Sequence, residues 1–116
     1  MDFALPNADT LFRAPDIFKA LGDPTRRALY ERLAGGGEHT VHALTGGAGV
    51  SQPAVSKHLA VLKAAGLVRD RREGRETHYS AEPRALAPLV DWMGLYGAFW
   101  EGRFNRLEDL LNRMDQ

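Results

Sequence analysis

The chain contains no cysteine, which excludes disulfide bonds, thiolate metal sites and thiol redox sensing together. It also has no apolar run near the roughly 20 residues that a membrane-spanning helix needs. The first twelve residues, MDFALPNADTLF, lack the basic and apolar regions of a signal peptide. We therefore predict a cytoplasmic protein without a membrane partner. Its 116 residues, 44% hydrophobic and 26% charged, predict one globular domain over residues 1–116.

An excess of either charge is also lacking, because 15 Lys and Arg balance 15 Asp and Glu. The distribution of these charges is uneven. Residues 51–79 carry six basic and three acidic residues, whereas residues 1–50 carry five and six, and residues 80–116 carry four and six. We therefore expect a local basic surface in the middle of the chain, where it would attract an anionic partner.

Helix start and stop residues divide the first half of the chain. Asp23 and Pro24 begin a predicted helix that ends at a run of three glycines, and residues 15–22 form a shorter helix before it. Thr40 begins a third helix of barely two turns, and Ser51 begins a fourth. Four helices are therefore expected before residue 66.

The second half of the chain follows a different pattern. The fourth helix ends at Gly66, and residues 67–80 then alternate around Gly74 as a two-stranded hairpin would. A long helical pattern runs from about residue 84 to residue 114. The predicted fold class is mainly α with a small β-hairpin, in the order α-α-α-α-β-β-α.

The fourth helix has two chemically different faces at 100° per residue. One arc is short, polar and cationic, and it contains Gln52, Pro53, Ser56, Lys57, Ala60, Lys63 and Ala64. The opposite arc is apolar apart from one histidine, and it contains Ala54, Val55, His58, Leu59, Val61, Leu62 and Ala65. We expect His58 to pack inward with a hydrogen bond to the scaffold.

The polar arc begins at the helix N-terminus, where backbone N–H groups favour a phosphate. Residues 40–65 therefore form a helix-turn-helix candidate, whose second helix would enter the major groove of DNA. Gln52 can pair with adenine, Ser56 with several bases, and Lys57 with guanine or phosphate, while Pro53 can contact a thymine methyl. The alternative is a solvated polar face on a packed helix.

Four arginines surround the turn of the hairpin in RDRREGRETHY, namely Arg69, Arg71, Arg72 and Arg75. An exposed arginine tip suits the phosphate backbone or a narrowed minor groove. Its alternative role is to solubilise a sheet edge and block the addition of another strand.

Three stretches, FKALGDPTRRALYERL, VSQPAVSKHLAVLKAAGLV and REGRETHYS, together resemble the ArsR-type (ArsR/SmtB) winged helix-turn-helix repressors over residues 16–114. The resemblance implies a homodimer that binds operator DNA and is released by an effector, here a possible small molecule. In this family the fourth helix would read the DNA bases (the reading helix), and the hairpin of residues 67–80 would be the wing. The predicted DNA contacts are Ser51, Gln52, Pro53, Ser56, Lys57 and Lys63 of the reading helix and Arg71, Arg72, Arg75 and His78 of the wing.

The best-known members of that family sense metals through two cysteines in the third helix and acidic or histidine ligands in the terminal helix. This chain departs from both patterns, because it has Thr40, Val41 and His42 in the third helix and no histidine in residues 84–116. His39 and His42 would supply only half of a site, and carboxylates alone bind zinc poorly. We predict no metal and no cofactor.

The terminal helix carries apolar residues at steps of three or four, a spacing typical of a packed seam. A helix of about 30 residues cannot bury this seam against a small domain alone, so we predict a dimer. The predicted dimer residues are Leu89, Met93, Tyr96, Trp100, Phe104, Leu107 and Leu111. An effector pocket is the alternative for the aromatic cluster, but a pocket also needs convergent polar groups.

Two further classes of function are compatible with parts of the sequence. A winged-helix module that binds protein through the terminal helix shares the fold, but the basic hairpin counts against it. An enzyme is disfavoured because Ser56 and His58 lie two residues apart on a helix and point to different faces, so they cannot pair as nucleophile and base.

Overall fold

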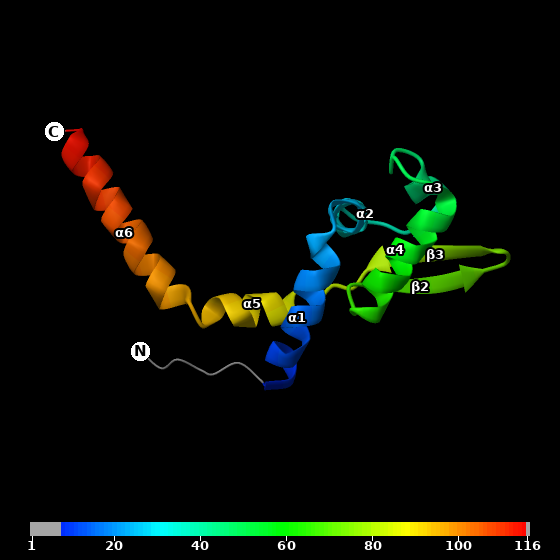
Figure 1. Ribbon diagram of the computed structural model, residues 1–116, viewed down its shortest axis with the longest axis horizontal. Helices are drawn as coiled ribbons and strands as arrows, with labels where there is room; N and C mark the ends of the chain where they lie inside the picture. The colour runs from blue at the N-terminus through cyan, green and yellow to red at the C-terminus, as the bar shows by residue number, and fades with distance from the viewer. Residues whose placement is uncertain (1–7, 116) are drawn as a thin grey trace.

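The computed structural model describes residues 8–115, with the side chains of residues 13–97, 99 and 101–115. Within this range the order of elements is α1 (Ala8–Gly22), α2 (Pro24–Ala34), β1 (His39–Thr40), α3 (Val41–Thr45), α4 (Gln52–Ala64), β2 (Val68–Glu73), β3 (Glu76–Ala81), α5 (Ala87–Gly94) and α6 (Gly97–Met114) (Figure 1). The predicted class, mainly helical with a small antiparallel sheet, is confirmed.

Three predicted helix starts are confirmed by side-chain caps. The Asp23 carboxylate accepts a hydrogen bond from the Arg26 amide at 2.9 Å, which also lowers the pKa of Asp23. Thr40 and Ser51 cap α3 and α4 in the same way, with distances of 3.1 and 3.3 Å from oxygen to amide nitrogen. Each cap satisfies an amide that the first helical turn leaves without a partner. The start of α1 differs, since this helix begins at Ala8, seven residues before the predicted start.

The core lies between α2, α4 and the inner face of the sheet. Val55, Leu59 and Leu62 of α4 are fully buried, and Leu29 and Leu33 of α2 pack in the same cluster. Burying a side chain of this size contributes roughly 1.5–3 kcal/mol. The apolar arc of α4 therefore fixes which side of that helix faces solvent.

The sheet has three strands in the order β1-β3-β2, one more than the predicted hairpin. In β1, His39 and Thr40 pair with Tyr79 and His78 of β3, and the shortness of this strand left it without a sequence signal. Gly74 has φ +61° at the first central position of the two-residue turn. This conformation favours glycine and matches the twist of the two strands.

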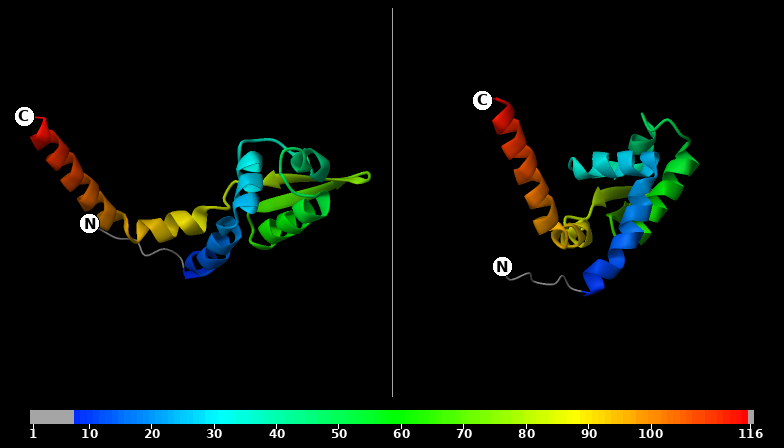
Figure 2. Two further views of the ribbon diagram at one scale, coloured as in Figure 1. Left: turned by 45° about the horizontal axis from the view of Figure 1, so that its top comes forward. Right: turned by 60° about the vertical axis from the view of Figure 1, so that its left-hand side comes forward.

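The predicted continuous helix over residues 84–114 is wrong. The chain forms two helices, α5 and α6, with Leu95 and Tyr96 between them. Gly94 and Gly97 flank this break, and each costs roughly 1 kcal/mol of helix propensity relative to alanine. Beyond the break α6 projects away from the other elements in every view (Figures 1 and 2). No helix within residues 8–115 is long and apolar enough to cross a membrane.

Candidate nucleic-acid interface

The start of α4 presents a polar surface to solvent. Ser51, Gln52, Pro53, Ser56 and Lys57 are all exposed, as the faces of the helix predicted. Ser51 caps the Ala54 amide, Val55 donates to the Ser51 carbonyl, and Pro53 has no N–H, so the Gln52 amide is the donor of the first turn left for an anion. The surface therefore combines hydrogen-bonding side chains, one cation and a helix N-terminus.

The turn between α3 and α4 is held by an arginine that sequence reasoning missed. The guanidinium of Arg32 in α2 donates to the carbonyls of Leu44, Gly46 and Ala43 at 2.9, 3.1 and 3.2 Å. These carbonyls lie at the end of α3, where a helix leaves acceptors unsatisfied and a cation is favoured. Arg32 thus positions α3 relative to α2 and, through the turn, the start of α4.

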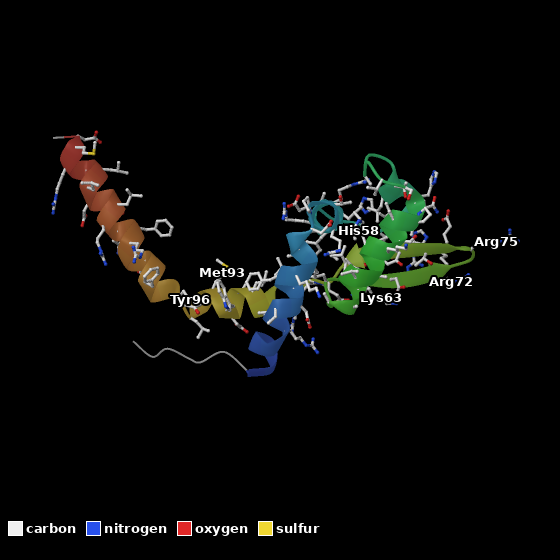
Figure 3. The ribbon with its side chains drawn as sticks, viewed as in Figure 1. His58, Lys63, Arg72, Arg75, Met93 and Tyr96 are labelled. Atoms are coloured by element: carbon white, nitrogen blue, oxygen red, sulfur yellow. The ribbon has the colours of Figure 1, made fainter. Side chains whose placement is uncertain are left out.

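The hairpin tip and the start of α4 border the same groove. Gln52 of α4, His42 of α3 and Arg75 of the tip line a groove of about 290 Å³, together with Thr40, Val41, Glu76 and Thr77. Arg75 lies at the end of the hairpin, farthest from α5 and α6 (Figure 3). Sequence spacing separates Gln52 from Arg75 by 23 residues, so only the fold shows that they share a surface.

The strands of the hairpin place neighbouring arginines on opposite faces. Arg71 pairs in register with His78, and Arg72 pairs with Thr77. Successive residues of a strand point to opposite sides, so Arg72 shares its face with Asp70. Asp70 bonds to Lys63 of α4, which identifies the face of Arg72 as the one beside α4.

Two of the five cations predicted to contact DNA are held by carboxylates. Lys63 Nζ lies 3.0 Å from Asp70 Oδ2, which joins the last turn of α4 to β2. The Arg71 guanidinium binds both oxygens of Glu38 and one oxygen of Glu73, and these hydrogen bonds raise the pKa of Arg71. Neither partner could be identified from the sequence, because each carboxylate is distant along the chain or follows no helical spacing.

The other three cations, Lys57, Arg72 and Arg75, form no ion pair with any residue that the structure describes. They remain exposed on the start of α4 and on the distal half of the hairpin. His78 is half-buried, and its Nε2 lies 3.8 Å from carboxylate oxygens of both Glu73 and Glu76. The cationic surface is therefore smaller than the sequence predicted.

The remaining histidines occupy separate positions. His58 is half-buried on the side of α4 toward α2 (Figure 3), and its charge contributes to lowering the pKa of Asp23 after the larger effect of the Arg26 amide. The expected hydrogen bond from His58 is not among those formed by the described residues. His39 has a buried Nδ1 without a partner there, and His42 is exposed. No cluster of three possible metal ligands occurs within the described part of the chain.

The residues predicted to form a dimer divide between the two terminal helices. Leu89 packs against the core of its own chain, whereas Met93 and Tyr96 are 62% and 45% exposed at the end of α5. Along α6, Phe104, Leu107 and Leu111 are more than half exposed, and the side chain of Trp100 lies outside the described residues. Sequence reasoning missed the exposed Val90 and Leu110, which extend the same apolar surface.

Comparisons with known proteins agree with this geometry. Residues 21–71 match a protein family described as a helix-turn-helix domain. The chain is 36% identical over 78 residues to the transcriptional repressor SdpR of Bacillus subtilis, covering 67% of this chain and 86% of that protein. It is 49% identical over 79 residues to the HTH-type transcriptional regulator Rv2034 of Mycobacterium tuberculosis, covering 67% and 73%.

A solved structure, the ArsR-like transcriptional regulator from Rhodococcus sp. RHA1, matches with a TM-score of 0.69 and 29% identity, covering 89% of this chain and 96% of that chain. A helix-turn-helix followed by a β-hairpin wing defines the class of winged helix-turn-helix DNA-binding proteins. Within that class, the chain belongs to the ArsR/SmtB family of transcriptional regulators.

Proposed function

We propose that this protein is a homodimeric repressor that binds an inverted-repeat operator and is released by an effector that does not act through thiols. The observation that carries the proposal is the groove shared by Gln52 at the start of α4 and Arg75 at the hairpin tip. A base-reading helix and a phosphate-binding wing must face the same DNA, and this groove brings their contact residues together.

The start of α4 reads bases in this proposal. Gln52 pairs with an adenine edge, Ser56 bonds to a neighbouring base, and Pro53 contacts a thymine methyl. The Ser51 hydroxyl and the Gln52 amide hold a phosphate, which fixes the depth of the helix in the major groove.

Three exposed cations supply the phosphate contacts. Lys57 lies one turn into α4, Arg72 shares the face of β2 that lies beside α4, and Arg75 lies at the hairpin tip. None of the three has an ion pair with a carboxylate of the described residues that would have to break on DNA binding. Their attraction to phosphate is therefore not offset by such a loss.

A second copy of the chain covers the apolar surface of α5 and α6. Leu107, Leu110, Leu111 and Met114 are each at least half exposed, and among the described residues the main contact of α6 with its own chain is with α5. A contiguous apolar surface of this kind marks a protein interface. A two-fold dimer would place the two reading helices about 34–36 Å apart, on successive major grooves of one DNA face.

Substituting Leu107 and Leu111 together with glutamate tests the dimer. Sedimentation velocity should show a dimer for the unmodified protein and a monomer for the variant, because four carboxylates would enter one interface. Asn105→Glu, on the opposite side of α6, is the matched control and should stay dimeric. A dimer that survives the double substitution would place the interface elsewhere.

The effector acts through linkage. A ligand that prefers the dimer conformation unable to bind DNA lowers operator affinity by the factor by which DNA lowers ligand affinity. Since the chain has no cysteine, that ligand is not sensed by thiol oxidation or thiolate coordination.

Gln52→Ala tests the assignment of the reading helix. Footprinting would first locate the operator, and single base changes would then be compared in the two proteins. The variant should lose about 1–3 kcal/mol of discrimination at one adenine in each half-site and keep its affinity for random duplex. An unchanged base preference at every position would remove α4 from base reading, and co-purification of a protein partner without DNA binding would favour a protein-binding module.

A further inference from the structure

We infer that the ion pair between Glu38 and Arg71 is a clamp that sets the position of the wing relative to the helix-turn-helix. Arg71 is then a positioning residue for DNA binding, and not the phosphate contact that the sequence predicted. The inference rests on the proposed function, because it assigns the role of one residue within the proposed DNA-binding surface.

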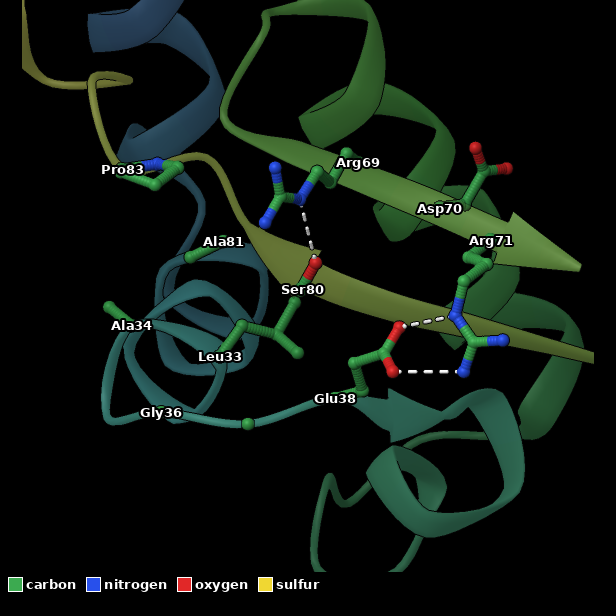
Figure 4. A pocket seen from close by; sticks show the side chains of 11 residues that line it. Leu33, Ala34, Gly36, Glu38, Arg69, Asp70, Arg71, Ser80, Ala81 and Pro83 are labelled. Atoms are coloured by element: carbon green, nitrogen blue, oxygen red, sulfur yellow. Dashed lines mark hydrogen bonds and ion pairs between the residues drawn. The ribbon is translucent and has the colours of Figure 1, made fainter.

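The pair has the geometry of a two-pronged arginine–carboxylate contact. Arg71 Nε donates to Glu38 Oε2 at 3.0 Å, and a terminal nitrogen donates to Oε1 at 2.9 Å (Figure 4). The other terminal nitrogen donates to Glu73 at 3.0 Å. All three guanidinium nitrogens therefore bind carboxylate oxygens, and parallel contacts of this kind fix orientation as well as distance.

The clamp connects two segments that the sheet separates. Glu38 directly precedes β1 and the Thr40 cap of α3, whereas Arg71 lies on β2 at the other edge of the sheet. Arg71 pairs with His78 of β3, and His78 pairs with Thr40 of β1. The side chains of Glu38 and Arg71 thus meet across the middle strand, 33 positions apart in the chain.

The base of the wing packs against the core through Val68, Tyr79 and Ala81, and its attachments beyond this apolar packing are few. Strand β1 contributes only two residues of pairing to β3, and the Lys63–Asp70 pair attaches β2 to α4 on the other face of the sheet. In Figure 4 the Asp70 side chain points away from the Glu38–Arg71 pair, which agrees with the alternation of a strand. The two ion pairs therefore hold the wing from opposite faces, one toward α3 and one toward α4.

Phosphate binding by Arg71 would conflict with these contacts. To reach DNA, Arg71 would have to leave Glu38, and the carboxylates of Glu38 and Glu73 would stay near the phosphate. Like charges at such a distance oppose the approach. Arg72, the next residue, lies on the opposite face and has no such carboxylate partner among the described residues.

Reversing the two charges tests the clamp. Glu38→Gln and Arg71→Gln should each weaken operator binding by a similar factor without changing its salt dependence. The double variant Glu38→Arg/Arg71→Glu should bind more tightly than either single variant, because the ion pair with position 38 forms again with its polarity reversed, although the contact with Glu73 is lost. Arg72→Gln is the matched control, and in a dimer it should reduce the slope of log affinity against log salt by about 1.8.

The opposite results would overturn the inference. If Arg71 contacted phosphate, Glu38→Gln would free it and tighten binding, Arg71→Gln would reduce the salt slope as Arg72→Gln does, and the reversed pair would bind weakly. Any of these three results assigns Arg71 to the DNA.

Amide hydrogen exchange on free protein separates this inference from the proposed function. Exchange at His39 and Thr40 of β1 should accelerate in both single variants and return toward the original rate in the reversed pair. If the unmodified protein did not prefer operator over random duplex, the proposed function would fail while exchange still tested the clamp. Unchanged exchange in both single variants would refute the clamp whatever the DNA result.

Discussion

Arg75→Ala should lower the salt dependence of operator binding by a calculable amount. Each protomer offers three cations without a carboxylate partner in its described residues, Lys57, Arg72 and Arg75, so a dimer offers six. Each neutralised phosphate contributes about 0.9 to the slope of log affinity against log salt, which gives a slope of about −5.4. Removing Arg75 from both protomers should change this slope to about −3.6.

The assay is fluorescence anisotropy with a labelled operator duplex between 50 and 200 mM salt. Over that range the unmodified protein should lose roughly 10³-fold in affinity and the variant roughly 10²-fold. Lys63→Ala is the matched control, because Lys63 is already paired with Asp70 and should leave the slope unchanged. Both variants should remain dimers in sedimentation velocity.

A slope near −9 for the unmodified protein would refute the division of the cations into two that are paired with carboxylates and three that are free to bind phosphate. That value corresponds to all five predicted cations of each protomer contacting phosphate, including Lys63 and Arg71. An unchanged slope in Arg75→Ala would separately remove the hairpin tip from the DNA.

Three further results are expected from substitutions in the scaffold. Leu59→Ala, in the fully buried centre of α4, should lower the free energy of unfolding in urea by about 2–5 kcal/mol, whereas Val61→Ala at a 41% exposed position of the same helix should cost far less. Gly66→Ala should cost roughly 1–2 kcal/mol because Gly66 has φ +78°, while Gly94→Ala, in α5 with no atom near an added Cβ, should not destabilise. The hydrogen bonds from arginine lower the pKa of Glu38 below its ordinary 4.5, so the contribution of this pair is present above pH 4.5 and lost as pH falls through the folded pKa. Hydrogen exchange of the β1 amides, corrected for its intrinsic pH dependence, should accelerate in that acidic range in the unmodified protein but not in Glu38→Gln. A flat exchange profile in both proteins would contradict this expectation. An equal loss of unfolding free energy in Leu59→Ala and Val61→Ala, or in Gly66→Ala and Gly94→Ala, would contradict the other two.

Local sequence determined the parts of the fold that local chemistry controls. Thr40 and Ser51 cap helices because a short side-chain oxygen satisfies an amide three residues away. Gly74 marks the hairpin turn because its positive φ excludes most other residues. The faces of α4 also followed from periodicity, with Leu59 inside and Lys57 outside, except that Val61 of the predicted apolar arc is exposed.

The sequence failed where distant residues decide the structure. The two-residue strand β1 exists only because β3 lies beside it, and periodicity cannot detect so short an element. The break at Leu95 and Tyr96 was missed because apolar spacing continued across it, although Gly94 and Gly97 marked the place. In this segment the low helix propensity of glycine outweighs a regular pattern of hydrophobic residues.

The candidate site shows the same limit. All of the predicted polar residues at the start of α4 are exposed, but the pairing of Arg71 with Glu38 depends on a contact between residues 33 positions apart. A count of cations along the hairpin therefore does not reveal that Lys63 and Arg71 are paired with carboxylates. Charge patterns predict where a basic surface lies, and only the fold shows which of its members are already paired.

Titration of the protein against DNA from the region upstream of its own gene, at about 150 mM salt, tests the central claim most directly. The proposed function predicts a binding site in that region with an affinity at least about 10³ times that for random duplex of the same length. Equal affinity for the two duplexes would show that α4 and the wing do not read a specific sequence there, and it would contradict repression through an operator in that region.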